Sequence, residues 1–235
     1  MRFRKPFICI TMITIIIWCK IMLVDLNLAG REVLVVGGGS VGERKVCKFL
    51  SEGCSIVVGS KDFTDSLKRL GEEGKVKLVE VDAGSDPALL ERLVSRADIV
   101  VAATDDRKTN EEIANQTKNS DALVCVVDSP SDSDFSLAAT TNVGGIQIAI
   151  YTKGKSPAMA RLLRERIEKT ITKQDLLQVE LQSYARSIAK ARISDQKLRK
   201  DVVYQILYDS EVNILLEKGL FREAKAHVER IIDQY

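Results

Sequence analysis

The stretch Val33-Leu34-Val35-Val36-Gly37-Gly38-Gly39-Ser40-Val41-Gly42 decides the fold of this chain. Its apolar first half predicts a strand, and a helix is expected to follow the glycines over residues 41–51. In such a turn the first glycine permits the sharp bend, the second lets the backbone approach a pyrophosphate, and the third lets the helix lie close to the strand. Since the positive end of the helix then faces the phosphates, the sequence predicts a dinucleotide site.

Glycine-rich turns also occur for packing reasons alone, and packing stays the alternative explanation of this one. The strand before the pattern and the helix after it are the context that favours a ligand. The first part of the predicted cofactor site is the turn itself, namely Gly37, Gly39, Ser40, Val41 and Gly42.

The residues after the second strand are expected to bind the adenosine ribose, and an acidic residue is usual there. Here the strand is expected over residues 55–59, and Ser60, Lys61 and Asp62 follow it. Ser60 can hydrogen-bond a ribose hydroxyl and Lys61 can tolerate a 2′-phosphate, so these residues do not decide between NAD and NADP. Asp62 comes two places late and is more typical of a residue that begins the next helix. All three belong to the candidate cofactor site.

Strands and helices alternate along the first part of the chain. The expected strands are residues 32–36, 55–59, 76–80, 99–103 and 123–127, and the expected helices are residues 41–51, 63–70, 87–95 and 108–118. This order predicts an α/β fold with a Rossmann-like doubly wound parallel sheet. Ligands bind beyond the carboxyl ends of the strands in such sheets. Those ends add Thr104 and Asp105 to the cofactor site, and Asp128 follows the last strand, whereas Asp106 is expected to cap the next helix.

The alternation stops after the fifth strand. Asn142-Val143-Gly144-Gly145 is a strong turn signal between two strand-like runs, residues 135–140 and 146–151, which predicts an antiparallel hairpin. A basic helix is expected over residues 158–169. The rest of the chain is helical in character, with Gly219 between two helices.

These patterns divide the chain into domains. Residues 22–134 are expected to form a nucleotide-binding domain, residues 135–172 a hairpin and helix segment for dimerisation and substrate binding, and residues 173–235 a small helical C-terminal domain. In residues 1–21, basic residues precede an apolar run, as in a signal peptide, but Lys20 interrupts the roughly 20 apolar residues that a membrane span needs. This segment is either an upstream extension, with translation beginning at Met22, or a membrane-associating leader.

The composition excludes several classes of function. The net charge of +2 gives no argument for a nucleic-acid partner. The five cysteines form no C-x-x-C pair and there is one histidine, so no metal site is predicted. Unpaired thiols suit a reducing compartment and hence a cytoplasmic location, and Cys47 and Cys54 are expected to be small buried residues.

Four segments in order carry a family resemblance. They contain the glycine turn, Ala102-Ala103-Thr104-Asp105-Asp106, Val126-Val127-Asp128-Ser129-Pro130 and the segment 152–164, which begins Thr152-Lys153-Gly154-Lys155-Ser156-Pro157. Together they resemble precorrin-2 dehydrogenase, the dehydrogenase and ferrochelatase part of siroheme synthase. The match extends from about Met22 to Glu168.

The resemblance implies NAD-dependent oxidation of precorrin-2 to sirohydrochlorin, with Asp128 as the catalytic residue. A partly reduced tetrapyrrole needs a hydride acceptor and a base, and Asp128 follows a core strand where a base would face the nicotinamide. The alternative role of Asp128 is to form the turn before Ser129 and Pro130. The resemblance also implies ferrochelation in bifunctional members, and the residues do not decide whether Fe(II) is a substrate here.

The carboxylates of precorrin-2 call for basic groups in its pocket. The expected substrate residues surround the turn before the basic helix, and they are Thr152, Lys153, Gly154, Lys155, Ser156, Arg161 and Arg164. For Arg161 and Arg164 a solvated helix face is an equal alternative.

Free hairpin edges and the apolar stripe of the basic helix favour a homodimer with a shared site. The rival function is a nucleotide-sensing regulatory module of the kind that gates transporters. Such modules share the glycine turn but keep an acid after the second strand.

Overall fold

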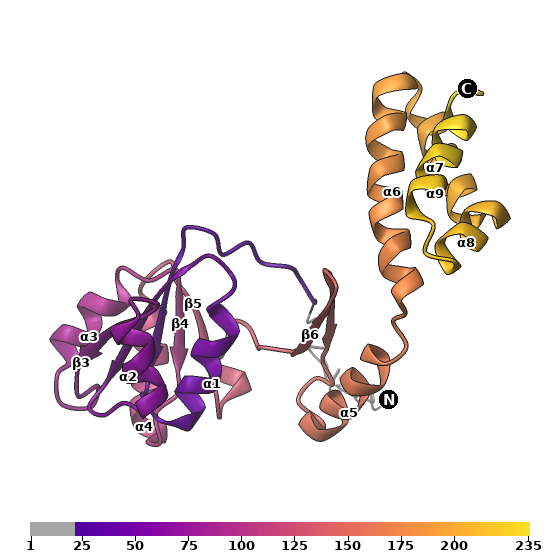
Figure 1. The fold of residues 1–235 in the computed structure, drawn as a ribbon. Coiled ribbons are helices and arrows are strands. Elements are labelled where there is room, and N and C mark those ends of the chain that lie inside the picture. The colour runs from indigo at the N-terminus through magenta and orange to yellow at the C-terminus, as the bar shows by residue number, and fades with distance from the viewer. Residues whose placement is uncertain (1–21) are drawn as a thin grey trace, which may run out of the picture. The chain divides into compact units, whose positions relative to one another are not determined.

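The computed structural model describes residues 22–235, which fall into two compact units (Figure 1). The first unit ends at Asp132 and the second comprises Ser133 to Tyr235. The expected leader, residues 1–21, lies outside the described residues. None of the helices in the described part of the chain is long and apolar enough to cross a membrane.

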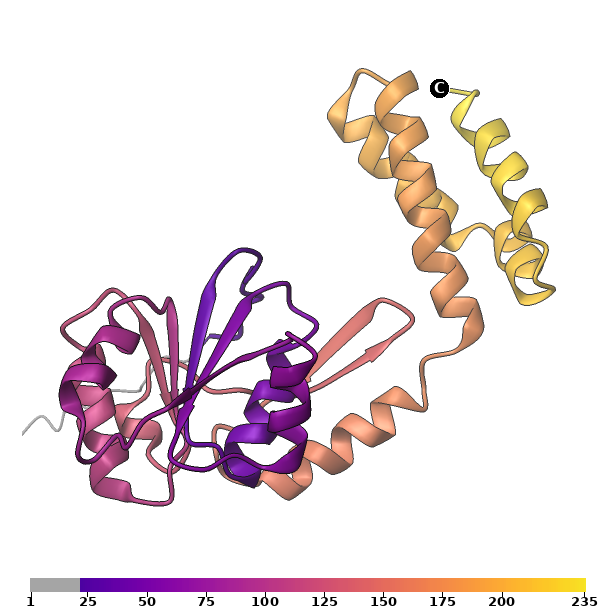
Figure 2. The ribbon, with the colours of Figure 1, turned by 60° about the vertical axis from the view of Figure 1, so that its left-hand side comes forward.

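The first unit has the predicted Rossmann-like architecture. Its parallel sheet has the strand order β3-β2-β1-β4-β5. The strands are β1 (Glu32–Val36), β2 (Ser55–Ser60), β3 (Lys77–Glu80), β4 (Ile99–Ala102) and β5 (Leu123–Val126). The helices are α1 (Ser40–Phe49), α2 (Asp65–Glu72), α3 (Pro87–Val94) and α4 (Arg107–Thr117), and a short 3₁₀ turn (Pro130–Asp132) follows β5. Figure 2 shows the sheet between α1 and α2 on one side and α3 and α4 on the other.

The sequence forms this sheet because its central strands are apolar on both faces. Val33 and Val35 are fully buried on one face of β1, and Leu34 and Val36 belong to the core formed with α3 and α4 on the other. Strand order reverses between β1 and β4, and a crevice for ligands opens at such a switch point.

Helix caps set where the connecting turns end. Asp106 caps α4 as predicted, since its carboxylate accepts the backbone N–H of Thr109 at 3.0 Å. The expectation that Asp62 begins the second helix is wrong, because the Thr64 hydroxyl caps α2 by accepting from Leu67 N. The expected burial of Cys47 is also wrong, because this residue lies on the exposed side of α1.

The second unit begins with the hairpin, whose first strand differs from the prediction. Strand β6 (Ala139–Val143) pairs with β7 (Ile146–Ile150), and Asn142 and Val143 belong to the strand instead of the turn. The turn consists of Gly144 and Gly145 alone, with φ of 56° and 90°. A two-residue turn with both φ positive fixes the register of the strands, so β6 starts at Ala139 and the expected strand from residue 135 is wrong.

The remaining helices are α5 (Pro157–Glu168), α6 (Lys173–Arg192), α7 (Gln196–Tyr208), α8 (Ser210–Glu217) and α9 (Phe221–Ile232). Helix α5 contacts both strands of the hairpin, whereas α6 to α9 share a core of their own. Gly219, with φ of 71°, separates α8 from α9. The tail therefore contains two more helix boundaries than predicted, one between α6 and α7 and one at Asp209, whose carboxylate caps α8.

Candidate active site

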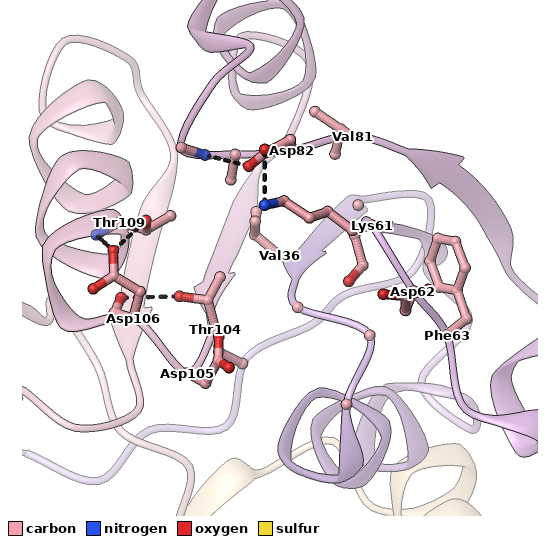
Figure 3. A pocket seen from close by; sticks show the side chains of 18 of the residues that line it. Val36, Lys61, Asp62, Phe63, Val81, Asp82, Thr104, Asp105, Asp106 and Thr109 are labelled. Carbon is pink, nitrogen blue, oxygen red and sulfur yellow. Dashed lines mark hydrogen bonds and ion pairs between the residues drawn. The ribbon is translucent and has the colours of Figure 1, made fainter.

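A cavity of about 970 Å³ opens at the carboxyl ends of β1 to β4 (Figure 3). Its size suits a small-molecule or cofactor site. Nine of the predicted cofactor residues line it, namely Gly37, Gly39, Ser40, Val41, Ser60, Lys61, Asp62, Thr104 and Asp105. The fold therefore brings together predicted cofactor residues that lie up to 68 positions apart in the chain.

The glycines of the turn separate into two kinds. A Cβ on Gly37 would lie 2.3 Å from Ala103 O, and one on Gly42 would lie 1.9 Å from Gly37 O, so the packing of the turn requires both glycines. A Cβ on Gly39 would meet no atom within 4 Å, and its φ of −80° suits any residue. The fold does not require a glycine at position 39, whereas a ligand lying against the backbone there does.

The start of α1 is suited to bind phosphate. Gly39 is the N-cap and has no side chain to satisfy the first N–H groups of the helix, and Ser40 and Val41 line the cavity beside it. Unpaired N–H groups and the helix dipole together favour an anion at this position. The turn therefore fits the pyrophosphate of a dinucleotide.

An ion pair lies on the side of the cavity next to the end of β2. Lys61 Nζ is 2.8 Å from Asp82 Oδ2, and both side chains are visible at the top of Figure 3. The Lys61 ammonium and a hydrogen bond from Ser85 lower the pKa of Asp82 to about 2. The sequence reasoning missed Asp82. Its signal was its place two residues after β3, which is also a carboxyl end of the sheet.

Asn110 links the cavity to Asp128. Its side chain is 1% exposed on α4, and its Oδ1 accepts the backbone N–H of Thr104 at 3.0 Å. Its Nδ2 donates to Thr104 O at 3.1 Å and to Asp128 Oδ1 at 3.3 Å. Thr104 lines the cavity, so one buried amide holds both the cavity wall and the expected catalytic carboxylate.

The sequence reasoning also missed Asn110, which had a readable signal. It occupies the same face of α4 as the buried Ile113 and Ala114, where a polar side chain needs partners. Asp128 itself is exposed in the turn after β5. Among the described residues no group of three or more His, Cys, Asp or Glu is placed to hold a metal ion.

The expected substrate residues all lie in the second unit. The loop before α5 is ordered by Thr152, whose hydroxyl accepts the backbone N–H of Ser156 at 3.2 Å. Lys153, with a positive φ of 55°, and Lys155 are exposed in this loop. The structure thus presents two ammonium groups to solvent just before the helix.

The two arginines of α5 are engaged within their own helix. Arg161 Nε lies 2.9 Å from Glu165 Oε1, and Arg164 contacts both Glu165 at 3.3 Å and Glu168 at 3.5 Å. These pairs raise the pKa of Arg161 and lower that of Glu165. Exposed pairs of this spacing are weak, so an incoming carboxylate can exchange with the glutamates.

A glycine turn that fits pyrophosphate, at the switch point of a doubly wound sheet, defines a dinucleotide-binding protein. Comparison with known proteins gives the family. Residues 24–139 match a family described as NAD(P)-binding, and residues 143–170 match the central region of sirohaem biosynthesis proteins.

Individual relatives agree with these two matches. The chain is 34% identical over 190 residues to a precorrin-2 dehydrogenase of Methanosarcina barkeri, covering 80% of this chain and 83% of that one. It is 35% identical over 145 residues to a siroheme synthase of Gluconobacter oxydans, covering 62% of this chain but only 30% of that longer protein. The chain belongs to the precorrin-2 dehydrogenase family, and the resemblance predicted from its motifs is confirmed.

A solved structure shows the same fold. The precorrin-2 dehydrogenase SirC superposes with a TM-score of 0.71 at 24% identity, and the match covers 89% of this chain and all of SirC. The expected order of a parallel sheet, a hairpin and C-terminal helices is thereby confirmed.

Proposed function

We propose that this chain oxidises precorrin-2 to sirohydrochlorin with NAD as the hydride acceptor. The observation that carries the proposal is the Asn110 amide, which ties the cavity residue Thr104 to Asp128. The carboxylate that we propose as the catalytic base is thus hydrogen-bonded to a buried side chain that also contacts the cavity wall. Family membership favours this function over the nucleotide-sensing module, which has no use for such a carboxylate.

Each part of the site has a role in this reaction. NAD, when bound, supplies the position that accepts hydride. Asp128 removes the proton that must leave the macrocycle, and its exposure makes the carboxylate accessible to a large substrate. The donor from Asn110 orients the carboxylate without neutralising it.

We propose that the loop beginning at Thr152 and the helix α5 that follows it recognise the tetrapyrrole. Precorrin-2 presents carboxylates at its rim, and Lys153 and Lys155 are exposed cations that can pair with them. Arg161 and Arg164 can join them by leaving Glu165. This proposal is supported by the charge and exposure of the loop and by its match to the sirohaem family.

We propose that the protein acts as a homodimer. Three apolar side chains along α5 are exposed, with 44% of Met159, 38% of Leu162 and 38% of Ile167 accessible. Among the described residues, no further strand pairs with either edge of the hairpin beside this helix. Pairing about a two-fold axis covers both features and would bring the Lys153 loop of one chain to the Asp128 turn of its partner.

A cytoplasmic location and Fe(II) as a second substrate complete the proposal. Cys47 and Cys54 are free thiols, which suits a reducing compartment. Insertion of Fe(II) into sirohydrochlorin requires a base for the pyrrole protons, and Asp128 is the carboxylate available for it. Adding Fe(II) after the oxidation tests this step apart from the first.

The experiment is incubation of the purified protein with precorrin-2 and NAD, followed in the visible spectrum. We expect the spectrum of sirohydrochlorin to develop together with stoichiometric NADH. Reactions without NAD, and with a chain beginning at Met22, serve as controls, and the shorter chain should be fully active. No turnover under conditions in which NAD binds would show that the protein has another function.

A further inference from the structure

The cavity carries more negative than positive charge. Lys61 has the one positive side chain among the described residues that line it, whereas four carboxylates line it, those of Asp62, Asp82, Asp105 and Asp106. Asp82 contacts Lys61 directly, and Asp105 and Asp62 also act on its ammonium group through space. The cation of the cavity is therefore neutralised before any ligand enters.

Asp82 takes the place of the acid that is missing after β2. Strand β3 pairs with β2 so that Ser60 lies opposite Glu80, and Val81 N donates to Ser60 O at 3.0 Å. The residue that follows Val81 consequently lies beside Lys61, where the adenosine ribose binds in this fold. The neighbouring strand supplies the carboxylate that the second strand lacks.

The position of Asp82 is fixed by more than the lysine. Its Oδ1 accepts the backbone N–H of Gly84 at 3.1 Å, and the Ser85 hydroxyl donates to the same side chain. The carboxylate is about one-third exposed, and it faces the cavity in Figure 3. Because Gly84 and Ser85 also hold it, the Asp82 carboxylate keeps its position even if Lys61 moves to another partner.

We infer that Asp82 and Lys61 act as one unit that selects NAD over NADP. The inference rests on the proposed function, since it concerns which dinucleotide the same cavity accepts. The free ribose hydroxyls of NAD can donate to the Asp82 carboxylate. The 2′-phosphate of NADP would instead face that carboxylate, and the nearby cation is already paired, so like-charge repulsion disfavours NADP.

The test measures the dissociation constants of NAD and NADP by titration calorimetry. The wild-type protein should bind NAD at least about tenfold more tightly than NADP, a difference of about 1.4 kcal/mol. Asp82→Asn, which removes the charge at constant size, should strengthen NADP binding and reduce the preference by about tenfold or more. Lys61→Met leaves Asp82 uncompensated and should weaken NADP binding further while changing NAD binding much less.

Asp98→Asn is the matched control. Asp98 pairs with Arg31 at 2.7 Å and has the same exposure as Asp82, 36% against 35%, but it does not line the cavity. This variant should leave the ratio of the two constants unchanged. Melting temperatures of all variants show whether each has folded.

The outcomes separate the inference from the proposed function. If the wild type binds NAD and Asp82→Asn changes the ratio no more than Asp98→Asn does, the inference is overturned and the proposed function stands. Equal wild-type affinities for NAD and NADP also overturn it. If the folded wild type binds neither dinucleotide, both the inference and the proposed function are wrong.

Discussion

The two units of the molecule hold their functional side chains by different means. In the first unit the backbone fixes them, because the cofactor residues follow strand ends and close packing requires the turn glycines Gly37 and Gly42. In the second unit the basic residues lie on an exposed loop and on one helix, where Arg161 and Arg164 are paired with neighbouring glutamates. The first unit is therefore preorganised, whereas the arginines proposed to bind substrate in the second unit would have to leave their glutamate partners first.

The sharpest test of the preorganised unit is Asp128→Ala. Removal of the base should lower kcat by about 10²- to 10⁴-fold, because no other carboxylate is held by Asn110. The dissociation constant of NAD should change by less than about twofold, since the cavity lining is intact. Asp121→Ala, at an exposed residue before β5, is the control and should be fully active. Turnover retained in Asp128→Ala would remove this carboxylate from the mechanism.

The two kinds of glycine in the turn should respond oppositely to one substitution. Gly39→Ala should leave the free energy of unfolding within about 1 kcal/mol of the wild-type value, because the space around Gly39 is open and its φ suits alanine. The same substitution should weaken the binding of NAD by about tenfold or more. Gly42→Ala should destabilise the domain by about 1–3 kcal/mol or more, since its Cβ meets Gly37 O. Thermal unfolding and calorimetry separate the two effects. If both variants lose stability alike, the glycines serve packing only.

The same contrast explains what the sequence could predict. Backbone rules applied to the first unit identified the strands, the switch point and nine residues of the cavity, because each follows from its distance to a strand end. Asp82 and Asn110 were missed, since their roles depend on contacts with Lys61 and Thr104 from other elements. In the hairpin, only the conformation of Gly144 and Gly145 showed which residues pair.

A charge placed in the apolar stripe of α5 tests whether the second unit needs a partner chain. The wild type should have about twice the 26.1 kDa mass of one chain in light scattering. Leu162→Lys should shift the protein towards monomer and lower turnover, because the charge would be buried at the interface. Val179→Lys adds the same charge at another exposed apolar residue, on α6, and should change neither property. A fully active wild-type monomer would rule out a shared site.

Asn110→Asp changes the link between the cavity and Asp128. The variant keeps the acceptor for Thr104 but loses the donor to Asp128 and places a second carboxylate beside it. We expect kcat to fall by about tenfold and the acidic limb of its pH profile to shift to higher pH, because like charges raise the pKa of one carboxyl. Asn115→Asp, on the exposed side of the same helix, should leave the profile unchanged. If Asn110→Asp lowers the stability of the protein without shifting the pH profile of kcat, Asn110 serves packing only.

The smallest expected effect is a pH dependence of the choice between NAD and NADP. The Lys61 ammonium lowers the pKa of Asp82 from its ordinary 3.8 to about 2, so this carboxylate stays ionised at pH 5 and above. Its contribution to folding stability is complete above the ordinary pKa and is lost as the pH falls from there through about 2. A phosphate monoester loses its second proton near pH 6, so the 2′-phosphate of NADP gains negative charge as the pH rises. The preference for NAD should therefore increase a few-fold between about pH 5 and pH 8 and increase less in Asp82→Asn. Calorimetry at constant ionic strength measures this, and a preference that falls with rising pH would mean that Lys61, and not Asp82, dominates the contact with the phosphate.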